Sequence, residues 1–197
     1  MKQNYRAIFG VLLILAGVLL IGQEFGIIGG GWDEIMLGLA FGAGSFFFAT
    51  MFLVDRSRWW AALVAFIFLG LAASQLIEVF LPSASGSIIG GTFLGLTGLG
   101  FLAIYFLDRT MWWAIIPAGV LVSLTAVTIV EDIPTVSGFE SGGLLFLGLG
   151  LTFLVLYFLP VQGSRLTWAI YPALSLLVFG ILIGFAELEA WAIIWPS

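Results

Sequence analysis

The short stretch Asp55-Arg56-Ser57-Arg58 separates two apolar segments, residues 34–54 and 59–81. Each segment is long enough to cross the hydrocarbon core of a bilayer as a helix, which takes about 20 residues. Similar apolar segments, separated by short interruptions with charge, glycine or proline, follow along the chain. We predict seven membrane-spanning helices, at residues 7–28, 34–54, 59–81, 87–107, 112–130, 142–160 and 167–186.

The composition is that of a membrane protein. Hydrophobic residues make up 62% of the 197 positions and charged residues only 9%, whereas a soluble domain has about 25% charged residues. Seven spans leave roughly 40 positions for loops and ends, which is too few for an extramembrane catalytic domain. We therefore expect residues 1–197 to form a single all-α polytopic membrane domain, a helical bundle.

The charged residues alternate along the chain. All six basic residues lie at the N-terminus or after an even-numbered span, whereas nine of the eleven acidic residues lie at the other ends of the spans. Cytoplasmic loops carry an excess of lysine and arginine, so the pattern predicts a multi-pass protein with a cytoplasmic N-terminus. The basic residues are Lys2, Arg6, Arg56, Arg58, Arg109 and Arg165.

The first span also follows two basic residues, as a signal peptide does. No small-residue cleavage site comes after it, and we expect it to be retained.

The eight tryptophans lie at the ends of spans. Five follow the basic loops, and three lie at the opposite, acidic ends. Indole rings favour the membrane–water interface, so we predict two interfacial belts; the alternative is a stacking site for a ligand. The first belt contains Trp59, Trp60, Trp112, Trp113 and Trp168, and the second contains Trp32, Trp191 and Trp195.

The sequence also contains an internal repeat of two spans. Leu37-Gly38-Leu39 recurs as Leu94-Gly95-Leu96 and as Leu147-Gly148-Leu149. Because each unit holds two spans, the tandem units are parallel. The C-terminal stretch 191–197 is interpreted either as the first turn of a truncated eighth span or as an interfacial stub. The units cover residues 1–54, 55–108, 109–160 and 161–197, the last of them incomplete.

Residues 1–50 carry a pattern of glycine, leucine and tryptophan. It comprises Arg6, the run Gly10-Val11-Leu12-Leu13-Ile14-Leu15-Ala16-Gly17, then Gly26-Ile27-Ile28 and Trp32-Asp33-Glu34-Ile35. This region resembles the LiaI/LiaF-like transmembrane region of bacterial membrane proteins, with Met36-Leu37 where that family has a proline. The resemblance implies a bacterial protein of the cytoplasmic (inner) membrane that lacks catalysis. Some members of the family regulate cell-envelope stress signalling through a partner kinase, but those regulators carry a soluble portion that residues 1–197 lack.

Glycines gather in the even-numbered spans. In lipid, small residues let two helix backbones approach closely, because association depends on packing and not on the exclusion of water. We therefore predict that these glycines are helix-packing sites, either within the protein or against partner helices. They are Gly38, Gly42, Gly91, Gly95, Gly148 and Gly150.

The residue types that carry most protein chemistry are rare in this chain. It has no histidine and no cysteine, and its one lysine is Lys2. Imidazole and thiolate ligands are therefore missing, and a serine or threonine nucleophile would lack its usual base. We also find no ionisable residue near the middle of a span, where proton relays and coupled transporters carry one. We expect no catalytic residue, no metal and no cofactor, and six scattered basic residues make nucleic acid an implausible partner.

These observations predict a function without catalysis. We expect an accessory or scaffold subunit, or a regulator, that acts through helix–helix contacts with other integral membrane proteins or with itself in the lipid bilayer. The alternative is a transporter or channel for a small neutral or lipid-like substrate.

Overall fold

A computed structural model describes residues 32–132, 141–161 and 164–184, together with residues 10, 14, 17, 18 and 21. Most of the predicted first span, residues 7–28, lies outside the described residues, as do Trp191 and Trp195. The described part is helical, except for a two-residue antiparallel pair in one turn. Six of its helical segments are long and apolar enough to cross a membrane, and they match the second to seventh spans predicted from the sequence.

Short turns connect α2 to α3, α3 to α4 and α4 to α5. Two of the helices, α5 and α7, are preceded by a single 3-10 turn, η1 and η3. The strands β1 and β2 pair between α6 and α7. The elements are α2 (Trp32–Val54), α3 (Trp59–Phe80), α4 (Gly86–Leu107), η1 (Trp112–Ala114), α5 (Ile115–Glu131), α6 (Ser141–Phe158), β1 (Pro160–Val161), β2 (Ser164–Arg165), η3 (Thr167–Ala169) and α7 (Ile170–Gly184).

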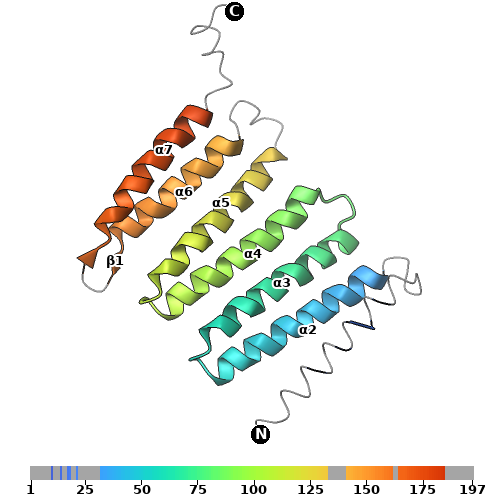
Figure 1. The fold of residues 1–197 in the computed structure, drawn as a ribbon. Helices are drawn as coiled ribbons and strands as arrows, with labels where there is room; N and C mark the ends of the chain where they lie inside the picture. Colours follow the sequence, from blue (N-terminus) through green and yellow to red (C-terminus); the bar gives the residue numbers. More distant parts are fainter. Residues whose placement is uncertain are drawn as a thin grey trace, which may run out of the picture.

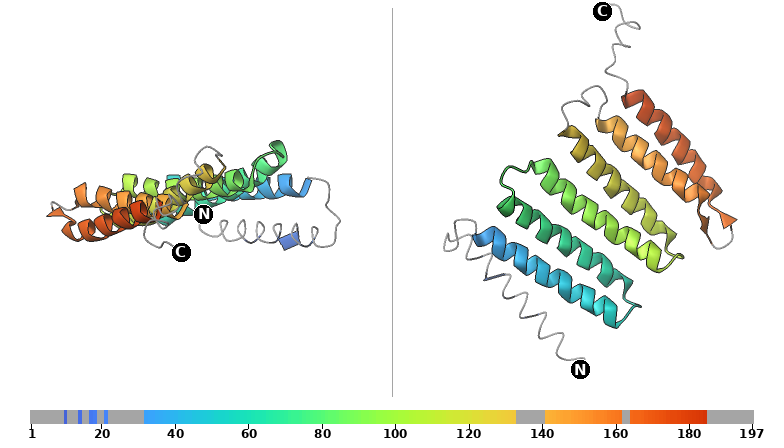
Figure 2. Two further views of the ribbon diagram at one scale, coloured as in Figure 1. Left: turned by 90° about the horizontal axis from the view of Figure 1, so that it is seen from above. Right: turned by 180° about the vertical axis from the view of Figure 1, so that it is seen from behind.

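The six helices stand side by side in one row (Figure 1). The extensive contacts all join consecutive helices, from α2 against α3 to α6 against α7. Viewed from above in Figure 2, the row is one helix thick. The described helices therefore differ from the bundle expected from the sequence. The physical reason is that lipid chains are as apolar as leucine side chains, so no exclusion of water forces the helices to close around a common core.

Polar side chains and prolines define where the helices begin. The hydroxyl of Ser85 accepts a hydrogen bond from the Ile88 backbone N–H, which caps the first turn of α4. Pro117 and Pro172 are each the third residue of their α-helix, after a 3-10 turn. Proline is tolerated in a first turn, where its missing N–H breaks no intrahelical bond. Neither proline therefore interrupts its helix.

The most buried residues lie at one end of the row. Ala61, Ala114 and Ala169 are fully buried where α3, η1 and η3 pack against the preceding helices. The largest fully buried side chains are Ile104 and Leu156, which belong with Ala114 and Ala169 to one apolar cluster. This cluster joins α4, α5, α6 and the turn before α7. The largest fully buried side chains thus lie toward the end where the tryptophans lie.

Candidate functional site

The candidate site is the set of close contacts between consecutive helices. The glycines predicted as packing sites can be tested by asking what a Cβ atom would meet at each. At Gly38 it would lie 3.2 Å from Leu76 Cγ on α3, and at Gly91 it would lie 2.7 Å from Thr128 Oγ1 on α5. Gly95 has more room, since its nearest atoms belong to Thr125 at 3.5 Å. At these three positions the helices are in contact, and the fit is tightest at Gly91.

Gly42 differs from the others. A Cβ atom there would meet no described atom within 4 Å. Of the two glycines in the Gly-x-x-x-Gly pattern of α2, only Gly38 therefore lies in a close helix–helix contact among the described residues. Gly44, which was not predicted as a packing site, packs closely against α3 instead. A Cβ atom there would lie 2.7 Å from Phe68 Cε1.

Gly148 and Gly150 face two different neighbours. A Cβ at Gly148 would lie 2.7 Å from Ser123 Cβ on α5, whereas a Cβ at Gly150 would lie 2.7 Å from Leu177 Cγ on α7. Residues two apart on a helix point in nearly opposite directions. The same holds on α4, where Gly98 faces α5 and Gly100 faces α3. Helices with small residues on two opposite sides pack closely with a neighbour on each side, which is the geometry of a row.

The contact between α5 and α6 is built from two reciprocal pairs. Gly119 on α5 faces Thr152 on α6, and Gly148 on α6 faces Ser123 on α5. The Ser123 hydroxyl donates to the Gly119 carbonyl at 2.7 Å, and the Thr152 hydroxyl donates to the Gly148 carbonyl at 2.8 Å. Each hydroxyl is thus satisfied within its own helix while its side chain fills the space above a glycine of the other. Gly119, Ser123 and Thr152 were not predicted as packing residues, although Gly-x-x-x-Ser and Gly-x-x-x-Thr on consecutive spans are visible in the sequence.

The contact between α6 and α7 brings backbone against backbone. A Cβ at Gly143 would lie 2.5 Å from the backbone nitrogen of Gly184 and 2.9 Å from the carbonyl oxygen of Gly180. These are backbone atoms, so no change of side-chain conformation can make room. Gly143, Gly180 and Gly184 were not among the glycines predicted as packing sites. Their signal is Gly-x-x-x-Gly at residues 180–184, opposite a glycine on the preceding span.

Hydroxyl groups also link helices directly. Ser45 donates to the Ala65 carbonyl across α2 and α3 at 2.8 Å, and Ser74 donates to the Ile89 carbonyl across α3 and α4 at 3.1 Å. Such bonds between membrane helices contribute about 0.6 kcal/mol each on average. They supplement the steric fit of the small residues.

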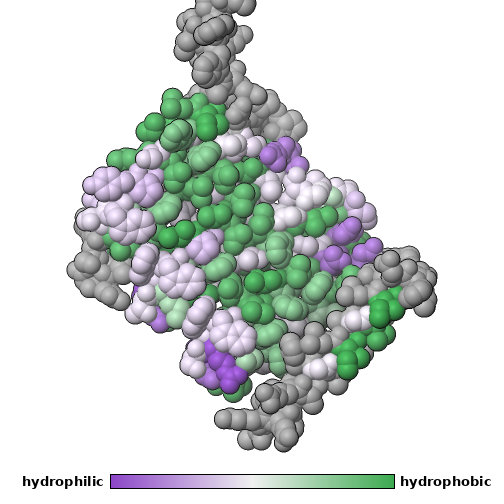
Figure 3. Space-filling view, viewed as in Figure 1, coloured by the Kyte–Doolittle hydropathy of each residue, from purple (hydrophilic) through white to green (hydrophobic). Residues whose placement is uncertain are grey.

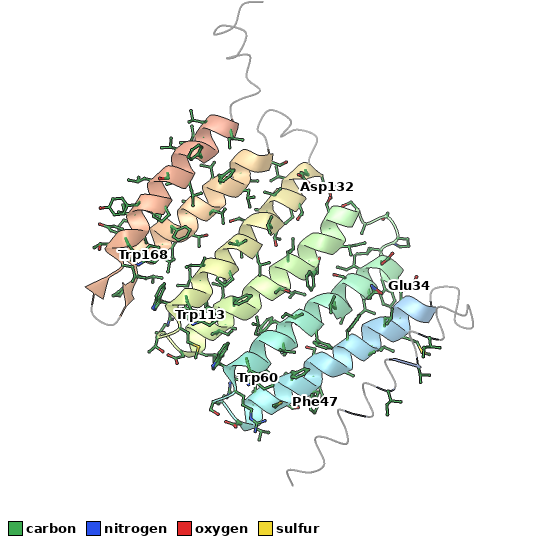
Figure 4. All side chains as sticks on the ribbon, in the orientation of Figure 1. Glu34, Phe47, Trp60, Trp113, Asp132 and Trp168 are labelled. Atoms are coloured by element: carbon green, nitrogen blue, oxygen red, sulfur yellow. The ribbon has the colours of Figure 1, made fainter. Side chains whose placement is uncertain are left out.

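The tryptophans after the basic turns line one end of the row, which we call the tryptophan end (Figure 4). In each helical hairpin one of them stacks edge-on with a phenylalanine of the preceding helix. The pairs are Phe48–Trp60, Phe101–Trp113 and Phe153–Trp168, with ring centroids 6.2, 6.5 and 6.1 Å apart. Trp59 stacks on Trp113, and Trp112 stacks on Trp168. The five residues therefore form a connected aromatic edge, and the ring contacts join one hairpin to the next.

Trp60, Trp113 and Trp168 are about two-fifths exposed. This partial exposure suits an indole at a membrane interface, where the ring is buried in part and its N–H stays near water. Trp32 is the first residue of α2 and so begins that helix at the opposite end of the row.

The charges separate between the two ends of the row. Asp55, Asp108 and four arginines lie in the turns of the tryptophan end and give it a formal charge of +2. Five acidic residues belong to the other, acidic end, among them the labelled Glu34 and Asp132 (Figure 4). At the acidic end the Ser85 hydroxyl donates to the carboxylate of Asp132, which connects the turn before α4 to the end of α5. The four arginines are Arg56, Arg58, Arg109 and Arg165, and the five acidic residues are Asp33, Glu34, Glu78, Glu131 and Asp132.

In two turns of the tryptophan end, an aspartate accepts hydrogen bonds from the hydroxyl and the backbone N–H of the residue two positions later. Asp55 accepts hydrogen bonds from the Ser57 hydroxyl at 2.6 Å, from Arg58 Nε at 2.9 Å and from the Ser57 N–H at 3.1 Å. Asp108 accepts from the Thr110 hydroxyl at 2.7 Å and from the Thr110 N–H at 2.9 Å. Hydrogen bonds to the ionised form favour that form. The hydroxyl of Ser57 and the guanidinium of Arg58 therefore lower the pKa of Asp55, and the hydroxyl of Thr110 lowers the pKa of Asp108.

We expect the variant Asp108→Ala to unfold at a lower temperature than Asp108→Asn, because asparagine can still accept both bonds from Thr110. The pKa of Asp108 is lower in the folded state than its ordinary value of 3.8. Its stabilising effect is therefore complete above that value and is lost as the pH falls through the folded-state pKa. Thermal unfolding in detergent between pH 7 and pH 3 measures this. The stability advantage of the native protein over Asp108→Ala should shrink with acid, and an advantage independent of pH would contradict the assignment.

Among the described residues, no group of three or more histidine, cysteine, aspartate or glutamate side chains could hold a metal ion. What the fold does define is a class of protein: an all-helical chain whose six described helices have the length and composition of membrane spans. No protein-family model, curated protein or solved structure matches the chain.

Proposed function

We propose that this protein is a non-catalytic integral membrane protein that acts as an accessory or scaffold subunit, or as a regulator, through helix–helix contacts. The observation that carries the proposal is the open row. Among the described residues, the extensive contacts of each inner helix are with its two sequence neighbours, so much of its remaining surface is available to lipid or to other proteins.

These free sides are apolar along several successive helices. Leu99 and Phe106 on α4 are 49% and 63% exposed, and Val122 and Ile129 on α5 are 45% and 50% exposed. Leu151 and Phe158 on α6 follow the same spacing of seven residues and are also exposed. Residues seven apart lie on the same side of a helix. Figure 3 shows one broad face of the row, on which apolar residues predominate.

A flat apolar face favours the scaffold role over the transporter or channel, which needs an enclosed passage. The described helices of one copy stand in a single layer (Figure 2) and so surround no pathway of their own. The alternative, a transporter or channel for a small neutral or lipid-like substrate, needs walls around its substrate. It would require further helices from the same chain or from other copies.

We propose further that the chain lies in the cytoplasmic membrane of a bacterium, with its N-terminus and the tryptophan end on the cytoplasmic side. The arginines of that end and the carboxylates of the acidic end support this orientation by the positive-inside rule. The two-helix repeat supports the scaffold role, because repeated units present similar surfaces at regular intervals.

The test is photo-crosslinking in native membranes. A diazirine-bearing aliphatic residue replaces Leu99, which is exposed, or Leu156, which is fully buried. We expect position 99 to give a discrete product with another membrane protein or with a second copy, in a fixed ratio after purification in mild detergent. Position 156 should give no such product. The exposed residues Ile129 and Leu151 are replaced in the same way. If positions 99, 129 and 151 all give lipid adducts alone, the proposed role is wrong. Protein-dependent solute flux in proteoliposomes would favour the transporter.

A further inference from the structure

Two arginines at the tryptophan end are folded back onto aromatic rings. The guanidinium carbon of Arg56 lies 4.7 Å from the centre of the Phe52 ring. That of Arg109 lies 4.6 Å from the Tyr105 ring and 4.7 Å from the Phe106 ring. A guanidinium stacked on an aromatic face is attracted by the ring and is held in a defined orientation. Both side chains therefore lie along the last turn of the preceding helix, α2 or α4.

The carboxylate in each of these turns is occupied by other groups. Asp55 pairs with Arg58 and also accepts bonds from Ser57. Asp108 accepts both of its bonds from Thr110. Neither Arg56 nor Arg109 pairs with a carboxylate in the described part of the chain. A guanidinium held over a ring by this attraction keeps N–H groups that can donate to a planar or tetrahedral oxyanion.

The position of Arg109 along the helix is that of a lipid headgroup. Phe106, one of the rings under this guanidinium, is 63% exposed on the outside of the row and belongs to the apolar span. The guanidinium thus lies where the apolar surface of α4 ends. The half-exposed Trp60 and Trp113 follow the same two turns at the same end of the row (Figure 4). In a bilayer, the oxyanions at this level are the phosphate groups of lipids.

We propose that Arg56 and Arg109 bind the phosphate groups of anionic phospholipids in the leaflet that surrounds the tryptophan end. Each guanidinium donates to the phosphate oxygens, and at Arg109 the exposed ring of Phe106 contacts the start of the acyl chains. Because this inference needs the spans to lie in a membrane but not the scaffold role, failure of either proposal leaves the other standing.

The experiment measures the lipid bound to purified protein in nanodiscs that contain phosphatidylglycerol, phosphatidylcholine or both. We expect the native protein to retain phosphatidylglycerol selectively. Arg109→Ala should bind it about fivefold more weakly, the factor that one interfacial arginine provides. Arg109→Lys should bind with intermediate affinity, because lysine keeps the charge but loses the planar contact. Inorganic phosphate should not compete, and competition would point to a site for the free ion.

The matched control removes an arginine without changing the net charge. Asp55→Asn combined with Arg58→Ala deletes the ion pair of the first turn and leaves Arg56 in place. This variant should retain phosphatidylglycerol as the native protein does. If it loses as much lipid as Arg109→Ala, or if Arg56→Ala with Arg109→Ala loses none, the proposed sites are wrong. Circular dichroism of each variant establishes that it is folded.

Discussion

Replacement of Gly143 by alanine is expected to push α6 and α7 apart and to destabilise the protein strongly. The added methyl group would lie 2.5 Å from the backbone nitrogen of Gly184 and 2.9 Å from the carbonyl oxygen of Gly180. Since both are backbone atoms, the only relief is a movement of one helix. Overpacking in a close-packed interior costs about 1–3 kcal/mol, and we expect this variant at or above the upper value.

The neighbouring glycine supplies the control for this prediction. A methyl group on Gly142 would lie 3.6 Å from Ile183 Cγ2, which is an ordinary contact distance. Gly142→Ala should therefore keep the native unfolding temperature or raise it slightly, because alanine favours helix by about 1 kcal/mol over glycine. Thermal unfolding of both variants in one detergent measures the difference. Equal unfolding temperatures would show that α6 and α7 do not meet at Gly143.

Replacement of Gly148 by alanine should loosen the contact between α5 and α6, and a second substitution should restore it. The new methyl group would lie 2.7 Å from Ser123 Cβ. Removing that Cβ by Ser123→Gly clears the space. The double variant should therefore be more stable than Gly148→Ala alone, although Ser123→Gly by itself weakens α5 by about 0.5 kcal/mol through its lower helix propensity.

This restoration can be measured as a double-mutant cycle. Residues in contact show interaction energies of about 0.5–3 kcal/mol, and here the sign should be favourable. Gly95→Ala serves as the control on α4, since its nearest neighbour, Thr125, is at an ordinary distance of 3.5 Å. Combining Gly95→Ala with Ser123→Gly should give strictly additive effects. Additive effects for Gly148→Ala with Ser123→Gly as well would contradict the pairing of α5 with α6 at these residues.

The sequence was sufficient to place the described spans. The predicted limits 59–81 and 87–107 differ by one residue from those of α3 and α4. Such agreement is expected where long apolar runs end at strong signals, here the turn beginning at Asp55 and the serine cap of α4. The tryptophans after the basic turns could also be located, because a bilayer places indole rings and charges at its two surfaces.

The helix-packing residues could be predicted only in part. Gly38, Gly91 and Gly148 lie in contacts between helices, but the same pattern included Gly42, which meets no described atom within 4 Å. Conversely, Gly119 and Gly143 were missed, although their contacts are among the closest. A glycine in a sequence indicates that close approach is permitted. Whether a neighbour uses it depends on the direction in which that glycine points.

The sequence by itself determined the number, length and alternating charge of the described spans, since these depend on the transfer of single segments between water and lipid. Only the tertiary structure decided that the helices form a row, that Gly148 and Gly150 serve different neighbours, and that Ser123 lies on Gly148. The physical reason is that a helix that is apolar on all sides has no polar face to orient it. Its rotation is set by the steric fit of small residues against one particular neighbour, which is a property of the pair of helices.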